Sequence, residues 1–117
     1  MDPKQKRKAV KEATAAHKAA MVELADAVWE LAEPPLHETK SAELIADFLD
    51  ARGFEVEFCI PSCPTAFRAT RGAGKPTIGM LGEYDALPDC GEKPDTYGHG
   101  CGHNLLGAAP AAGAAAI

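Results

Sequence analysis

Apolar side chains recur along the first third of the chain at three-, four- and seven-residue intervals. This spacing places them on one face of a long amphipathic helix. The helix is expected to stop before Pro34 and Pro35, because proline lacks an N–H donor and clashes with the preceding turn. The stripe consists of Val10, His17, Met21, Leu24, Val28 and Leu31.

A second amphipathic helix is expected after the proline pair. Thr39 and Ser41 are both of a type that caps helix N-termini, so the helix should begin near one of them. Gly53 suits the left-handed backbone position that commonly ends a helix. The apolar stripe of this helix consists of Leu44, Ile45, Phe48 and Leu49.

Three segments beyond Gly53 have the patterns of strands. Residues 54–60 begin by alternating apolar and acidic side chains, which is typical of a strand with one solvated face. Residues 65–70 form a second candidate, followed by a glycine-rich turn at 72–75. Residues 76–82 carry no charge and are mostly apolar, which predicts a strand buried on both faces.

Residues 104–117 consist almost wholly of small side chains, which predicts a helix able to approach a sheet closely. Pro110 implies a kink, or a regular helix that begins only after Gly107. Helices that flank a sheet define the α/β class. We therefore expect two N-terminal helices, several sheet strands and a small-residue helix within one unit of residues 1–117.

Composition narrows the class of protein. The 117 residues are 46% hydrophobic and 25% charged, as in ordinary soluble domains. The net charge of −5 argues against a nucleic-acid partner, and the basic residues at 4–11 are interpreted as a solvated helical turn. No segment has the roughly 18 apolar residues of a membrane span. We find no export signal and irregular cysteine spacing, so we expect a cytoplasmic protein without disulfides or a membrane partner.

The segment from His99 to Asn104 reads HGCGHN and holds two imidazoles and a thiol within five residues. Alternate residues of an extended run point to one side, so a single metal could take Cys101 and His103, and His99 as well. Zinc suits thiolate plus imidazole, whereas a pair of bridged metals is the alternative. The structural alternatives are a zinc ion that only stabilises the loop and a turn that binds no metal.

Two carboxylates, Glu83 and Asp85, follow the apolar segment 76–82. Sites in open α/β sheets form beyond the carboxyl ends of strands, and alternate residues there can point to the same side. The pair could therefore bind a metal, or orient a ligand histidine through a hydrogen bond. The alternative is that both are surface residues of a turn.

These motifs resemble those of the M20 family of metallopeptidases and amidohydrolases. Residues 99–107, HGCGHNLLG, are similar to the family signature H-x-C-G-H-D/N, and residues 82–88, GEYDALP, resemble its upstream strand-end motif. Residues 64–67 and the paired helices resemble the branch that includes aminobenzoyl-glutamate hydrolases and amino-acid-conjugate hydrolases. The resemblance runs from about residue 25 to the end of the chain.

The resemblance implies a helix-flanked, zinc-peptidase-like catalytic domain with two divalent metals, zinc or manganese. By analogy Cys101 and His103 are metal ligands, and Asp85 holds a ligand histidine in place. Glu83 occupies the position where wider relatives carry that histidine. His99 and Asn104, at either end of the signature, support the ligands or contact the substrate. The implied reaction is hydrolysis of an amide bond in an N-acyl amino acid or a dipeptide-like small molecule.

The resemblance also places further machinery downstream of these motifs. A general-base glutamate, the remaining ligands and a lid domain that usually forms a homodimer lie there in the family. We therefore expect an N-terminal portion of a catalytic domain that is inactive alone. The alternatives are a small non-catalytic metal-binding or interaction module, completed by Asp85, Cys90 or His99, and a binding protein acting through the basic residues at 4–18.

Overall fold

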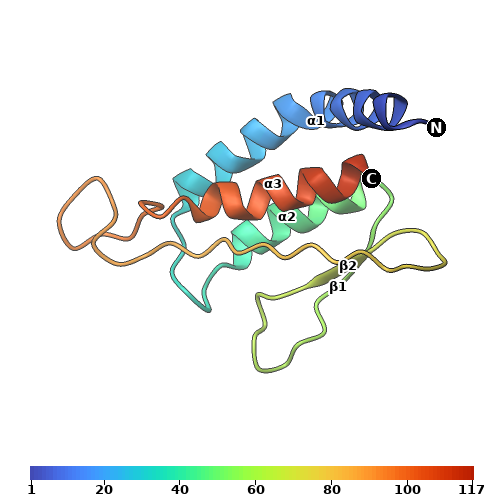
Figure 1. Cartoon of the computed structure of the whole chain (residues 1–117). Helices are drawn as coiled ribbons and strands as arrows, with labels where there is room; N and C mark the ends of the chain where they lie inside the picture. Colours follow the sequence, from blue (N-terminus) through green and yellow to red (C-terminus); the bar gives the residue numbers. More distant parts are fainter.

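Three helices lie on one side of the molecule, and extended chain runs along the other side (Figure 1). This computed structural model describes all 117 residues. The helices are α1 (Pro3–Leu31), α2 (Thr39–Asp50) and α3 (His103–Ala116), and the strands are β1 (Glu55–Glu57) and β2 (Arg68–Thr70).

Helix α1 confirms the first amphipathic prediction, with one correction. The Asp2 side chain accepts a hydrogen bond from the Gln5 N–H, and the Gln5 side chain accepts one from the Asp2 N–H. This reciprocal pairing satisfies two N–H groups at the helix start. The predicted stripe is wrong at its beginning, where Val10 is 60% exposed. The reason is length: α1 has 29 residues against 12 in α2 and 14 in α3, so its first half has no helix beside it to cover it.

Helix α2 begins at Thr39, but neither predicted residue caps it. The preceding residue, Glu38, makes no capping hydrogen bond either. Instead the Glu33 carboxylate reaches the helix start, where it accepts the Lys40 N–H at 3.1 Å and the Ser41 N–H at 2.6 Å. A carboxylate there satisfies free N–H groups and complements the helix dipole. At the other end Gly53 has φ 82°, which confirms its predicted position.

The hydrophobic core lies where the three helices meet. Small side chains make this meeting possible, and Ala42 in α2 and Ala108 in α3 are completely buried. The predicted small-residue helix is confirmed, with its start one residue before the predicted segment, but it packs closely against α1 and α2 and not against a sheet. The helix continues through Pro110, so of the two alternatives for this proline the start after Gly107 is wrong. The buried core consists of Leu24, Ala25, Val28, Ile45, Phe48, Leu49, Phe54, Ala108, Ala111 and Ala115.

The extended side of the molecule differs more from the prediction. β1 and β2 pair antiparallel with Val56 opposite Ala69, and both are shorter than the predicted strands. The prediction of a doubly buried strand at 76–82 is wrong for this structure, because the segment joins no sheet and Leu81 is 95% exposed. Helices cover only one side of it, and its backbone forms no ladder with the hairpin. Burial on both faces requires a covering layer on each side.

The fold class is accordingly mixed, with helices and one small antiparallel sheet, which is compatible with the α/β expectation. No helix combines the length and apolar character needed to cross a membrane. The four cysteines are all unpaired, and Cys59 and Cys101 are exposed.

Candidate metal centre

The two sequence motifs meet at the start of α3. The Nδ1 atom of His103 lies 2.8 Å from the Asp85 Oδ1 atom and 3.0 Å from the Asp85 carbonyl oxygen. The other ring nitrogen, Nε2, lies 3.3 Å from the Glu83 Oε1 atom. One imidazole thus stands between two carboxylates, with a side chain that is only 13% exposed.

A proline inside α3 helps to hold Glu83 in this position. Pro110 has no N–H group, so the carbonyl of Leu106, four residues earlier, has no donor within the helix. The Glu83 N–H donates to that carbonyl at 3.4 Å. The hydrogen bond that the helix loses at Pro110 is therefore replaced by one that ties the carboxylate segment to the first turns of α3.

Two glycines allow the segment that carries Glu83 to lie close to α3. A Cβ on Gly82 would lie 2.9 Å from the Leu106 carbonyl oxygen. A Cβ on Gly107 would lie 3.0 Å from the Tyr84 Cβ and 3.3 Å from the Glu83 carbonyl oxygen. Glu83 and His103 thus face each other because side chains are missing at both contact points, which the motif letters alone do not reveal.

His99 and Asn104 point away from this centre, toward the end of α1. The His99 Nε2 atom lies 3.1 Å from the Val28 carbonyl oxygen, and the Asn104 amide donates to the Ala25 carbonyl oxygen at 3.1 Å. Both residues are buried, and the His99 Nδ1 and Asn104 Oδ1 atoms have no hydrogen-bond partner in the chain. Burial lowers the pKa of His99 by more than the hydrogen bond to Val28 raises it. His99 is therefore neutral near pH 7, with its proton on Nε2.

Cys101 lies in the turn before α3 and is exposed. Gly102, between the thiol and His103, has φ 77°, a backbone conformation that suits glycine. No group of three or more His, Cys, Asp or Glu side chains in the chain could hold one metal ion. Hydrogen-bond and ion-pair contacts join His103 to Glu83 and Asp85, and no such contact joins Cys101 or His99 to these residues.

Two of the residues that meet here, His103 and Glu83, carry donor atoms of the kind that bind a divalent metal, although the cluster does not supply three converging ligands. The Asp85 carboxylate accepts the Nδ1 proton of His103, which leaves the Nε2 lone pair free, as in carboxylate–histidine–zinc arrangements. The Nε2 atom of His103 and the Oε1 atom of Glu83 lie 3.3 Å apart. Ligand bonds of about 2.0–2.2 Å at a tetrahedral angle separate two ligand atoms by about 3.3–3.5 Å. The pair is thus spaced like two ligands of one ion.

Sequence reasoning missed two residues that support this centre. Tyr84, between the carboxylates, donates its hydroxyl proton to the Thr65 carbonyl oxygen, and burial raises its pKa to about 12. Glu33 fixes the segment from another side, because its carbonyl oxygen accepts the Ala86 N–H at 2.8 Å. Alternate residues of an extended segment point to opposite sides, so the sequence could have placed Tyr84 on the side opposite Glu83 and Asp85. No pattern near Glu33 predicted its role.

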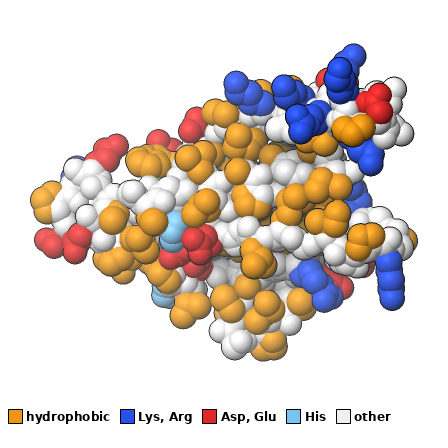
Figure 2. Space-filling view, viewed as in Figure 1, with side chains coloured by type: hydrophobic (Ala, Val, Ile, Leu, Met, Phe, Trp, Pro, Cys, Tyr) orange, Lys and Arg blue, Asp and Glu red, His pale blue; other side chains and the backbone are white.

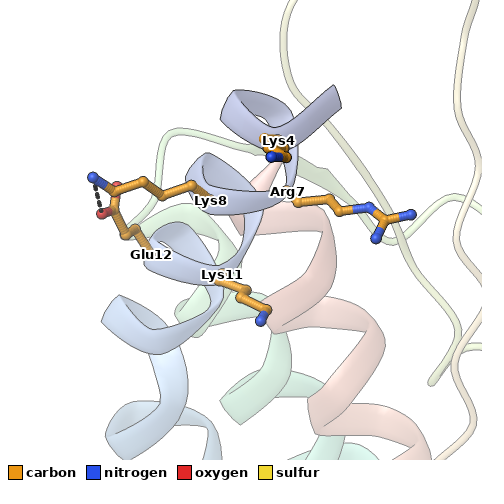
Figure 3. Close-up of a pocket in the computed structure, with 5 residues that line it drawn as sticks. All are labelled: Lys4, Arg7, Lys8, Lys11 and Glu12. Atoms are coloured by element: carbon orange, nitrogen blue, oxygen red, sulfur yellow. Dashed lines mark ion pairs between the residues drawn. The ribbon is translucent and has the colours of Figure 1, made fainter. Parts of the chain in front are cut away.

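Positive charge gathers elsewhere, at the N-terminal end of α1 (Figure 2). A shallow hollow of about 350 Å³ there is lined by Lys4, Arg7, Lys8, Lys11 and Glu12. The Arg7 and Lys8 side chains point in opposite directions, and Lys8 lies 3.8 Å from Glu12 (Figure 3). These cations do not converge on one point, as a compact anion site would require.

Comparison with known proteins gives one informative similarity. The chain is 42% identical over 105 residues to a subunit of the p-aminobenzoyl-glutamate hydrolase of Escherichia coli (strain K12). The match includes 81% of this chain and 22% of that protein, so the chain spans about a fifth of its relative's length. No family model and no solved structure matches the chain. The similarity supports the predicted aminobenzoyl-glutamate hydrolase-like relationship, and membership of the M20 family stays a prediction.

Proposed function

We propose that this chain carries the first part of the active site of a metal-dependent amidohydrolase. The reaction is hydrolysis of the amide bond in an N-acyl amino acid, and an aroyl-glutamate such as p-aminobenzoyl-glutamate is the substrate class. The name of the E. coli relative supports the substrate, and the two motifs support the reaction. M20-type architecture, with zinc or manganese as the metal, belongs to the same proposal.

The observation that carries the proposal is the line from Asp85 through His103 to Glu83. Asp85 keeps the proton of the imidazole on Nδ1 and fixes the plane of the ring. His103 then presents Nε2 and Glu83 presents Oε1, 3.3 Å apart, as two metal ligands. Cys101, two residues before His103 and exposed, is proposed as the thiolate ligand of the same centre or of a second metal beside it.

A divalent metal held by His103 and Glu83 would supply the chemistry of polarising the amide carbonyl and lowering the pKa of a bound water toward about 7. The residues of this chain position the ligand side chains and keep them in a fixed orientation. Asp85 prevents His103 from rotating, and the Glu83 segment is anchored to α3 through the Leu106 carbonyl. Such pre-positioning matters because small displacements of reacting groups are costly in rate.

The metal centre can be tested on the chain itself with Co²⁺, whose visible absorption reports its ligands. His103→Ala should weaken Co²⁺ binding strongly, and Asp85→Asn should weaken it about 10- to 100-fold, as loss of a supporting carboxylate does elsewhere. Cys101→Ala should remove the sulfur-to-cobalt absorption band. Matched controls are His37→Ala and Cys59→Ala, since both residues are exposed and far along the chain from the motif.

A catalytic type of centre also keeps an open coordination position. A hydroxamate should therefore change the Co²⁺ spectrum, whereas a closed structural site would not respond and would keep its ion through dialysis. Equal Co²⁺ affinity in the His103→Ala variant and the parent chain would refute the proposal. A spectrum that ignores hydroxamate would favour the non-catalytic metal-binding module instead.

A further inference from the structure

A second hollow in the molecule lies between the last turn of α1 and the loop of residues 90–99. Its volume of about 390 Å³ is within the range of small-molecule pockets. Trp29 and Tyr97, which are 44% and 43% exposed, line it together with His99. Glu30 and Glu92 supply carboxylates, and no lysine or arginine lines it. We call this hollow the Trp29 cavity.

The walls of the Trp29 cavity are fixed by backbone contacts. Leu87 and Gly98 exchange two hydrogen bonds of 2.9 and 3.0 Å, and the Gly91 N–H donates to the Thr96 carbonyl oxygen at 3.0 Å. A Cβ on Gly98 would lie 2.0 Å from the Cys90 carbonyl oxygen, so the two sides of the loop are in direct contact. A cavity with fixed walls binds without a large ordering cost.

We propose that the Trp29 cavity binds the neutral aromatic amine end of an arylamide substrate. Two half-exposed aromatic rings offer the flat apolar surface on which another ring stacks. The carboxylates of Glu30 and Glu92 accept hydrogen bonds from an amine. They also disfavour a substrate carboxylate, which no cation in the lining would neutralise. The proposal rests on the function proposed above and assigns one end of that substrate.

The position of the cavity suits this role. His99 lines the cavity and Cys101 follows it by two residues, so their Cα atoms are at most about 7.6 Å apart. This reach is comparable to the length of one aromatic ring with a substituent at each end. The cavity and the Cys101–His103 turn are thus neighbours along the chain, and the proposal places the carbonyl of the ligand on the side of that turn.

The experiment uses Trp29 as its own reporter, because it is the only tryptophan in the chain. The chain is labelled with ¹⁵N, kept free of metal with a chelator, and titrated while the single indole N–H resonance is followed. The probe is p-aminobenzamide, a neutral arylamine. It should shift the resonance to saturation and bind about three- to tenfold more tightly than benzamide, the effect of one added hydrogen bond. Free glutamate should leave the resonance unchanged.

Tyr97→Leu should weaken p-aminobenzamide binding several-fold. Phe58→Leu is the matched control, since Phe58 is a comparably exposed aromatic side chain on the β1–β2 connection and should leave binding unchanged. Equal affinity for benzamide, or tighter binding of benzamidine, a flat cation of similar size, would overturn the assignment to a neutral arylamine. Because metal is excluded, failure here leaves the Co²⁺ result standing, and failure of the Co²⁺ test leaves this one standing.

Discussion

The helical side and the extended side of this molecule bury their apolar residues to very different degrees. Val28, Ala42 and Ala108 are completely buried where the helices meet. On the extended side Leu81 and Ile78 are largely exposed, although their segment is one of the least polar in the chain. Apolar character alone therefore did not decide burial. Burial also required a neighbouring element of matching shape. Phe54 and Ala86 have one and are buried although neither lies in a helix, whereas Ile78 and Leu81 have none.

The candidate centre lies on the boundary between these two sides. His103 belongs to the helical side, whereas Glu83 and Asp85 belong to the extended segment. The two sides touch through Gly82 and Gly107, where no side chain intervenes. The geometry of the centre thus depends on the contact between the two sides. Substitutions at that contact should affect the centre more than substitutions within either side.

The largest expected difference in stability is between two phenylalanine-to-alanine substitutions, one on the helical side and one on the extended side. Phe48 in α2 is 8% exposed and lies under the Arg52 guanidinium, 3.6 Å from the ring centre. Phe48→Ala should lower the free energy of unfolding by about 3 kcal/mol or more, since it removes buried area and leaves a cavity. Phe58→Ala should cost about 1 kcal/mol or less, because Phe58 is 51% exposed. Urea denaturation measures both, and equal losses would break the comparison.

Adding one methyl group to α3 should change the stability by a smaller amount. The change should have opposite signs at Gly107 and Gly113. At Gly107 a Cβ would lie 2.9 Å from the Ile45 Cδ1 and 3.0 Å from the Tyr84 Cβ. Gly107→Ala should therefore destabilise the chain by about 1 kcal/mol, because overpacking outweighs the gain in helix propensity. At Gly113 the nearest atom is the Met80 sulfur at 3.5 Å, an ordinary contact. Gly113→Ala should stabilise by about 0.5–1 kcal/mol.

Circular dichroism during thermal unfolding compares these two variants directly. Gly107→Ala should also weaken Co²⁺ binding, because it pushes the Glu83 segment away from His103, whereas Gly113→Ala should not. Unchanged metal affinity in a destabilised Gly107→Ala variant would show that the centre does not depend on close contact at the boundary.

Periodicity predicted the helical side well, because a 3.6-residue pattern is a local property of the chain. The stripe of α2 and the small residues of α3 were both recognised from the sequence. The extended side was predicted less well, because a strand is defined by partners that lie elsewhere. Residues 76–82 have the composition of a buried strand, yet nothing in their own pattern reveals whether a ladder forms beside them.

The candidate centre was also predictable only in part. The motifs identified the carboxylates Glu83 and Asp85, and they grouped Cys101 with His103. They did not reveal the contact between His103 and Glu83, which depends on Pro110 leaving the Leu106 carbonyl free for the Glu83 N–H. That relation joins residues more than twenty positions apart, and no motif records it. The same holds for Glu33, which caps α2 from outside the helix.

The smallest expected effect concerns Glu33, which joins α2 to the segment of the centre. Burial raises the pKa of Glu33, but hydrogen bonds from the Ser41 side chain, the Ser41 N–H and the Lys40 N–H together lower it below its ordinary value of 4.5. A carboxylate with a lowered pKa in the folded state stabilises the fold above its unfolded pKa. This stabilisation is lost as the pH falls through the folded value.

Glu33→Gln should therefore cost at most about 1 kcal/mol near neutral pH, the range of a typical helix cap. The difference from the parent chain should shrink steadily below about pH 4.5, where the parent carboxylate takes up a proton and loses the same advantage. Urea midpoints measured from about pH 3 to about pH 7 give this curve, with the exposed Glu43→Gln variant of α2 as the control. A difference that persists unchanged at acid pH would mean that Glu33 acts through its shape and not through its charge. The variant keeps the backbone hydrogen bond between the Glu33 carbonyl and Ala86, so any loss of stability reports on the side chain alone.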